Sequence, residues 1–146
     1  MHELLQDSTM RLYVLCAAIL VLKMAFTGSA TGIVRLRRGA YITPEDYAFM
    51  GKAAAPPDEA VERLRRVHQN DLENILPFLI IGLLYALSGP AFGIACALFV
   101  TFTVARLLHT ATYMAEMQPW RSVFYEVGQI SLVVTTILLL VNLLSG

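Results

Sequence analysis

Four long apolar segments are the feature that most limits how this chain of 146 residues can fold. Each approaches the ~20 residues that a helix needs to cross the hydrocarbon core of a bilayer. The second reaches that length only if the polar turns before Ile75 are counted. With 57% hydrophobic and 15% charged residues, the sequence predicts an all-α integral membrane protein, a four-transmembrane-helix bundle formed by a single domain. The apolar runs are about 11–34, 75–87, 92–114 and 123–144. The helices expected around them are, in the same order, about 9–38, 61–88, 92–115 and 120–144.

The connections predict the topology. Short Gly/Pro turns at 88–93 and 115–120 make consecutive helices antiparallel, and the only sizeable loop, about 39–60, contains "TPEDYAF", where Thr43 can cap a short helix with Pro44 at its first position. Basic residues gather around that loop, which the positive-inside rule places in the cytoplasm with both termini on the far side. They are Arg35, Arg37, Arg38, Lys52, Arg63, Arg65 and Arg66.

The first segment is too long for a signal peptide, carries Lys23 and is followed by "RLRRG", so it is expected to remain in the mature protein. The formal net charge of zero gives no reason to expect a nucleic-acid partner. The membrane is either a bacterial inner membrane or the endoplasmic reticulum, since the composition does not choose between them. Membrane lipids are expected partners in either case.

Polar stripes run along three of the predicted helices at one membrane level. Helical spacing groups Arg66, Asn70 and Glu73 on the second helix, Arg106, His109 and Tyr113 on the third, and Arg121, Ser122, Tyr125 and Gln129 on the fourth. Arg106 lies roughly 12 Å inside the end of its helix, which predicts a partner or a wet cavity rather than snorkelling. Taken singly, the arginines could be topology determinants, the tyrosines interfacial aromatics, His109 a hydrogen-bonded bundle histidine and Asp71 a salt-bridge partner of nearby arginines.

The residue types suggest a ligand. Several arginines, a single carboxylate and several hydroxyls suit a small, mostly anionic molecule with one amine, because guanidinium groups grip carboxylates in pairs while Glu73 could hold an ammonium group. Ser122 beside Arg121 at a helix N-terminus could stabilise a thiolate. Glutathione fits this inventory, no metal is expected, and apolar surfaces open to lipid would admit a hydrophobic second substrate.

Four stretches carry a family resemblance: "ERLRRVHQNDLENILPFLIIGLLYALSGP", "TGIVRLRRGAYITPEDYAF", "ARLLHTATY" and "RSVFYEVGQ". In this order they resemble the membrane-associated proteins in eicosanoid and glutathione metabolism, the MAPEG family, and its branch of microsomal glutathione transferases and prostaglandin E synthases. The resemblance implies a homotrimer with three glutathione sites at subunit interfaces, in the cytoplasmic halves of the helices.

The resemblance also implies roles for residues. Arg121 and Ser122 match the residues implicated in chemistry at the sulfur, and Asp46 matches an acidic loop residue linked to catalysis in the synthase branch. The glutathione contacts that it implies are Arg35, Arg66, Asn70, Glu73, Arg106, His109, Tyr113, Arg121, Ser122 and Tyr125.

The expected activity is conjugation of glutathione to hydrophobic electrophiles through a stabilised thiolate, with glutathione-dependent peroxidase activity toward lipid hydroperoxides as a possible second activity. A prostaglandin E synthase is the first alternative, and Gln69, which stands where the synthase is expected to carry arginine, weakens it. A non-catalytic lipid-presenting adaptor would have a damaged glutathione site, whereas this polar set is nearly intact. A channel or transporter would need a polar stripe through the whole membrane, but the far-side halves of the helices are apolar.

Overall fold

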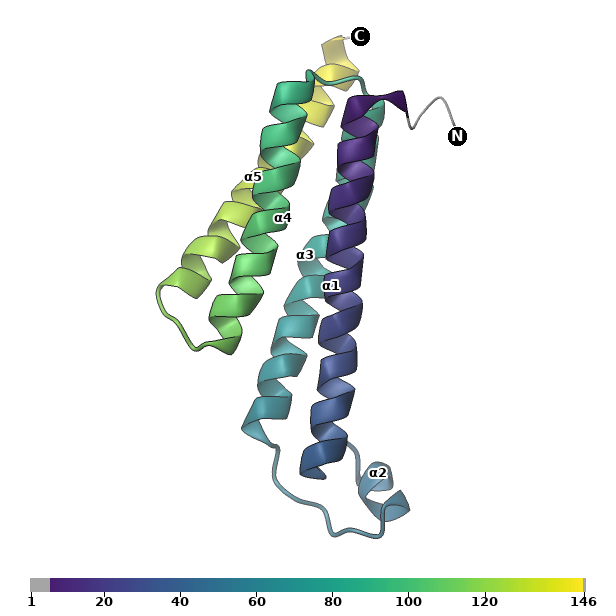
Figure 1. Ribbon diagram of the computed structural model, residues 1–146, viewed down its shortest axis with the longest axis vertical. Coiled ribbons are helices and arrows are strands. Elements are labelled where there is room, and N and C mark those ends of the chain that lie inside the picture. The colour runs from purple at the N-terminus through teal and green to yellow at the C-terminus, as the bar shows by residue number, and fades with distance from the viewer. Residues whose placement is uncertain (1–5, 146) are drawn as a thin grey trace.

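Five helices make up the computed structural model, which describes residues 6–145 (Figure 1). They are α1 Ser8–Arg38, α2 Pro44–Phe49, α3 Glu59–Leu87, α4 Phe92–Met114 and α5 Trp120–Ser145. By length and composition, all but α2 are able to cross a membrane. The prediction of an all-α protein with four membrane-spanning helices is therefore confirmed.

Local signals set where the helices begin and end. Asp7 caps α1 by accepting a hydrogen bond from the Met10 backbone N–H at 2.8 Å, and Gly39 ends the helix in the left-handed region at φ 62°. The short α2 begins as the sequence predicted, with the Thr43 hydroxyl accepting from the Asp46 N–H and Pro44 in the first turn. These three helix ends therefore lie where a side-chain cap or a glycine satisfies the free backbone groups.

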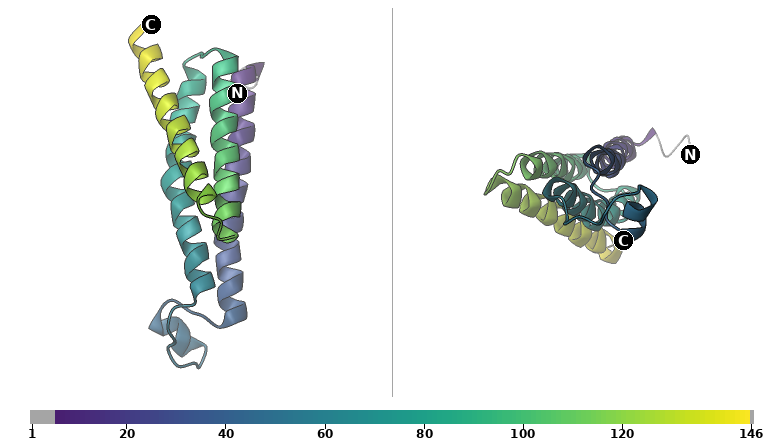
Figure 2. Two further views of the ribbon diagram at one scale, coloured as in Figure 1. Left: turned by 90° about the vertical axis from the view of Figure 1, so that its left-hand side faces the viewer. Right: turned by 90° about the horizontal axis from the view of Figure 1, so that it is seen from below.

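The four long helices form an elongated bundle of two pairs (Figure 2). α1 packs on α3 and α4, and α5 packs on α4 and α3, whereas α1 and α5 do not touch over the described residues. The α1–α3 pair extends beyond the α4–α5 pair toward α2, and the start of α1 and the end of α5 lie at the opposite end of the bundle (Figure 1). As a result, the turn from α4 to α5 lies beside α3 rather than beside α2.

The interior has an aromatic half. Tyr13, Phe78, Phe99 and Phe102 are buried against one another, with Phe78 and Phe102 stacked at 4.2 Å between ring centroids. Close approach of α1 and α3 depends on Gly82, where an added Cβ would lie 3.1 Å from the Tyr13 ring. This packing holds α1, α3 and α4 together in the half of the bundle away from α2.

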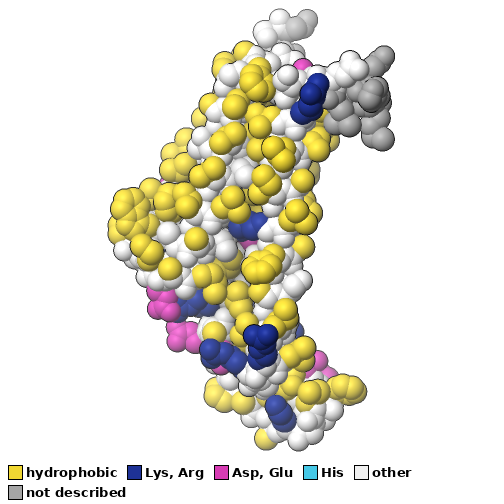
Figure 3. Space-filling model, in the orientation of Figure 1, with side chains coloured by type: hydrophobic (Ala, Val, Ile, Leu, Met, Phe, Trp, Pro, Cys, Tyr) yellow, Lys and Arg dark blue, Asp and Glu magenta, His cyan; other side chains and the backbone are white. Residues whose placement is uncertain are grey.

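Hydrophobic side chains cover most of the face seen in Figure 3, where most of the charged ones lie toward the α2 end. Leu22 and Phe26 of α1, for example, are 71% and 74% exposed. An apolar exterior of this extent is expected of a surface that faces lipid or another subunit.

Candidate functional site

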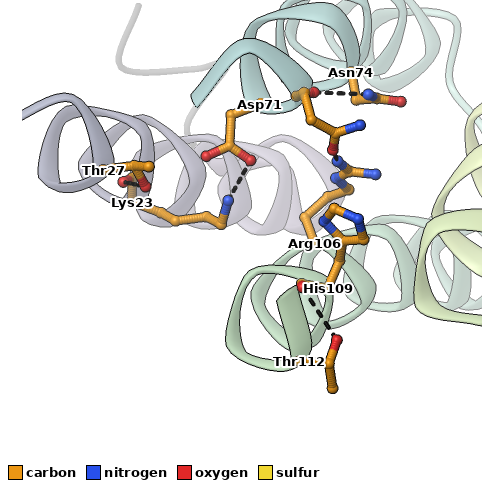
Figure 4. Close-up of polar contacts among 8 residues, drawn as sticks. Lys23, Thr27, Asp71, Asn74, Arg106, His109 and Thr112 are labelled. Carbon is orange, nitrogen blue, oxygen red and sulfur yellow. Dashed lines mark hydrogen bonds and ion pairs between the residues drawn. The ribbon is translucent and has the colours of Figure 1, made fainter. Parts of the chain in front are cut away.

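Arg106 of α4 is fully buried, with an exposed fraction of 0%, as is Asp71 of α3. Its Nη2 donates a hydrogen bond to the Asn70 side-chain oxygen on α3 (Figure 4). Its Nε and Nη1 have no partner among the described residues. Gly128 of α5 makes room for the side chain, because a Cβ there would lie 3.2 Å from the Arg106 Cδ. Buried donors without acceptors are costly in a membrane interior, so these N–H groups favour binding of an acceptor.

Asp71 points in a different direction from its neighbour Asn70. Its Oδ1 pairs with the ammonium group of Lys23 on α1, and both side chains are almost fully buried (Figure 4). The sequence had suggested that Asp71 is a member of a salt bridge, which is confirmed, but its partner is Lys23 rather than one of the neighbouring arginines. On α3 the nearby arginine Arg65 turns outward and pairs with Glu62 at 2.7 Å, whereas Lys23 reaches Asp71 from a helix that packs against α3.

Three aromatic rings stand beside Arg106. The His109 ring lies 5.6 Å from that of Tyr113 and 5.9 Å from that of Tyr125, measured between centroids. Arg106 lies over the Tyr125 ring at 5.7 Å, and Arg121 over the Tyr113 ring at 4.6 Å. The polar stripes of α4 and α5 thus meet, with the two guanidinium groups held against aromatic faces.

Two amides complete this cluster. Gln129 donates to the Asn74 side-chain oxygen at 2.7 Å and to the Tyr125 hydroxyl at 2.9 Å, and Asn74 in turn donates to the Asn70 backbone carbonyl at 2.7 Å. The sequence had placed Gln129 on the α5 stripe but had assigned it no role, and it had not singled out Asn74. The i, i+4 spacing of Asn70 and Asn74 was the signal available for finding this chain of bonds.

The start of α5 holds the residues expected at the sulfur. The Ser122 hydroxyl is exposed and lies 3.2 Å from the Gln118 side-chain amide. With that amide turned so that its oxygen faces Arg121, the oxygen accepts from the Arg121 Nε at 3.0 Å and the amide nitrogen donates to Ser122. Gln118, which the sequence did not indicate, thus links the cation to the hydroxyl.

Four of the expected site residues lie apart from this cluster. Arg35 of α1 pairs with Asp46 of α2 at 2.8 Å, Glu73 accepts from Gln69 at 2.9 Å, and Arg66 is exposed on α3. The chain therefore brings together Asn70, Arg106, His109, Tyr113, Arg121, Ser122 and Tyr125, whereas no hydrogen bond or ion pair among the described residues links this set to Arg35, Asp46, Arg66 or Glu73.

An apolar groove of about 290 Å³ lies between α4 and α5. Its lining residues are Val100, Thr101, Val104, Ala105, Leu108, Phe124 and Val127. Phe124 and Ala105 immediately precede Tyr125 and Arg106, so the groove runs along the two helices that carry the polar cluster.

A bundle of four membrane helices with a cluster of arginines, amides and tyrosines inside it defines a class of integral membrane protein with an internal polar site. The model of the MAPEG family matches residues 13–141. The chain therefore belongs to the MAPEG family, and the resemblance drawn from its sequence is confirmed.

Characterised relatives carry the names of two enzymes. Microsomal glutathione S-transferase 1 of Rattus norvegicus is 42% identical over 134 residues, which cover 88% of this chain and 86% of that protein. Prostaglandin E synthase of Bos taurus is 38% identical over 130 residues, which cover 88% of this chain and 85% of that protein. Prostaglandin E synthase of Homo sapiens is 39% identical over 132 residues, covering 88% and 87%.

Proposed function

We propose that this protein is a membrane-bound glutathione transferase that joins glutathione to hydrophobic electrophiles. The observation that carries the proposal is the buried Arg106, whose Nε and Nη1 have no acceptor among the described residues and which stands among Asn70, His109 and Tyr125. An anionic ligand would supply the missing acceptors. Relatives named glutathione S-transferase support glutathione as that ligand.

The proposed chemistry begins at the thiol. Arg121 and the Ser122 hydroxyl stabilise the thiolate of glutathione, so that the thiol proton leaves to solvent at a lower pH. The thiolate sulfur then attacks the electrophilic carbon, a C–S bond forms, and the leaving group departs with its electron pair. Gln118 orients both groups through its amide, so the cation and the hydroxyl face the sulfur together.

The second substrate would enter from the membrane. The apolar groove between α4 and α5 can hold part of a hydrophobic molecule next to the helices that carry Arg106 and Tyr125. A lipid hydroperoxide would use the same route: the thiolate sulfur attacks the terminal peroxide oxygen, the O–O bond breaks, and the lipid alkoxide takes a proton and leaves as the alcohol. A second glutathione then reduces the resulting sulfenic acid, giving glutathione disulfide and water, which makes peroxidase activity part of the proposal.

A homotrimer would complete the site. Arg35 of α1 and Arg66 and Glu73 of α3 have no hydrogen bond or ion pair to the cluster among the described residues, and α1 does not contact α5. We place these residues at the edge of the neighbouring subunit's site, where Arg35 would add a cation and Glu73 a partner for the glutathione amine. Asp46 then acts on the site through Arg35, with which it pairs.

The site would open toward the cytoplasm. The basic residues around the 39–60 loop favour that side by the positive-inside rule. The membrane is proposed to be a bacterial inner membrane or the endoplasmic reticulum.

Prostaglandin E synthase is the second candidate, favoured by relatives of that name at 38% and 39% identity. Thiolate formation is common to both activities, so the same cluster would serve. Gln69, bonded to Glu73, is the residue that favours the transferase. A lipid-presenting adaptor is the least supported, because the polar cluster that it would have lost is present.

Purified protein in detergent tests the proposal. Titration with glutathione should produce thiolate absorbance, and 1-chloro-2,4-dinitrobenzene should be conjugated. An electrophile panel that includes a lipid hydroperoxide and a prostaglandin endoperoxide then separates the candidates. Absence of both thiolate and conjugation would overturn the transferase assignment, and much faster turnover of the endoperoxide than of the aryl halide would favour the synthase.

A further inference from the structure

Three ionised side chains are buried in the interior between α1, α3 and α4. Within residues 6–145, Lys23, Asp71 and Arg106 are the only Lys, Arg, Asp or Glu side chains that are buried. Lys23 is the central residue of the 31-residue α1, as far from either membrane surface as that helix allows. A charge at such depth is unfavourable on insertion scales, so a lysine that only stabilised the fold would be a costly choice.

Adjacent residues of α3 separate the two cations. Asp71 turns toward α1 and pairs with the Lys23 ammonium group (Figure 4). Asn70 instead accepts one N–H of Arg106 on α4. Asp71 and Arg106 also attract each other across the interior, and Lys23 and Arg106 repel each other. If Lys23 were absent, Asp71 would be the nearest counter-charge for Arg106.

We propose that Lys23 is a positioning residue that neutralises Asp71, so that Arg106 keeps an uncompensated positive charge for the anionic ligand. Lys23 itself does not touch the ligand. The three buried charges sum to one positive charge, and the neutral amide of Asn70 orients Arg106 without cancelling it. This inference rests on the proposed function, because it assigns the ligand to the free N–H groups of Arg106.

The charge argument predicts that replacing Lys23 weakens glutathione binding, whereas replacing Asp71 does not. Lys23→Met leaves Asp71 to compensate Arg106, which should weaken glutathione binding about tenfold, since buried charges are poorly screened. Asp71→Asn adds to the net positive charge, so affinity should stay equal or increase. The double variant, Lys23→Met with Asp71→Asn, restores one net positive charge and should bind within about threefold of wild type, because replacing both members of a buried pair leaves no unpaired charge.

The test is calorimetric titration of each detergent-purified variant with glutathione at mildly alkaline pH, with thermal unfolding as a check of folding. Lys52→Met is the matched control, because Lys52 is the other lysine in the chain and is exposed on the loop. Its affinity should equal that of wild type.

The outcomes separate the possibilities. Loss of affinity in all three variants indicates a structural tie between α1 and α3 and overturns the inference, as does wild-type affinity in Lys23→Met. If a single variant does not fold, the double variant decides, because an affinity loss of about tenfold there contradicts charge compensation. A wild-type protein that binds no glutathione overturns the proposed function, and the inference with it.

Discussion

Arg106 shows how single residues create a polar site inside an apolar bundle. Its long side chain fits because α5 carries Gly128 opposite it, and its direction is set by one hydrogen bond to Asn70. The position of the guanidinium group therefore depends on the space that α5 leaves and on the acceptor that α3 provides. Both can be altered without touching Arg106.

Gly128→Leu should displace Arg106. A Cβ alone would lie 3.2 Å from its Cδ, and the larger side chain must occupy the space that the guanidinium stem now fills. Glutathione affinity is expected to fall about tenfold, the loss typical of one charge-assisted hydrogen bond, as measured by titration. Gly93→Leu is the control, since no atom lies within 4 Å of a Cβ at that exposed position; equal behaviour of the two variants would count against the role of Gly128.

Arg121→Ala and Ser122→Ala test the groups assigned to the sulfur. Loss of the cation should lower kcat/KM about 10²-fold or more, comparable to removing one donor to a developing anion, and should raise the pH at which thiolate absorbance appears. Loss of the hydroxyl should act in the same direction but less. Arg37→Ala, which removes an exposed arginine of α1, should leave turnover unchanged. Unaltered turnover in the Arg121 variant would remove it from the mechanism.

Sequence reasoning succeeded at residues whose partners lie on the same helix or repeat with helical spacing. The stripes of α4 and α5 were visible because His109 and Tyr113 share one face of α4, and Arg121 and Tyr125 share one face of α5. The Lys23–Asp71 pair could not be predicted from the sequence, because no sequence pattern sets how α1 is rotated against α3. Gln118 was missed for a related reason, since its contact with Ser122 depends on the conformation of a turn.

At the scale of elements, the helix ends are set by a few caps. Apolar length predicted the four long helices, and Thr43 with Pro44 predicted α2. The start of α3 was less evident, because its first turns are polar and lie outside the apolar run. Asp58 begins that helix by accepting from the Ala60 N–H at 3.0 Å and the Val61 N–H at 3.2 Å.

The Asp58 cap should make stability depend on pH. The hydrogen bond from the Val61 N–H, aided by the Arg38 guanidinium, lowers the pKa of the Asp58 carboxyl below its ordinary value. The stabilisation is therefore complete above the unfolded-state pKa of about 3.9, and is lost as the pH falls through the lower folded-state value.

Asp58→Ala should accordingly lower the thermal unfolding midpoint at neutral pH, and the difference from wild type should shrink below about pH 4. The Thr43→Ala variant provides the comparison, because its hydroxyl cap of α2 does not titrate and its effect should not vary with pH. An Asp58→Ala effect that persists unchanged in acid would show that the charge of the carboxylate is unimportant.

At the scale of the whole molecule, one chain carries two incomplete halves of the proposed site. α5 brings Arg121, Ser122 and Tyr125 to the cluster, whereas α1 carries Arg35 on a surface that α5 does not reach. The four apolar helices and the family could be predicted from the sequence, because apolar length and motif order are local properties. The separation of Arg35 from α5 could not, since it follows from which helices pack together.

This separation predicts that two inactive variants complement each other. In the proposed homotrimer, Arg35→Ala and Arg121→Ala should each be nearly inactive when expressed alone. If each site takes Arg35 from one subunit and Arg121 from its neighbour, co-expression of the two in equal amounts leaves about a quarter of the sites with both arginines. If both come from the same subunit, no mixed trimer contains a complete site. Conjugation activity of mixed trimers, isolated with a different affinity tag on each variant, therefore distinguishes a site shared between subunits from one built by a single chain.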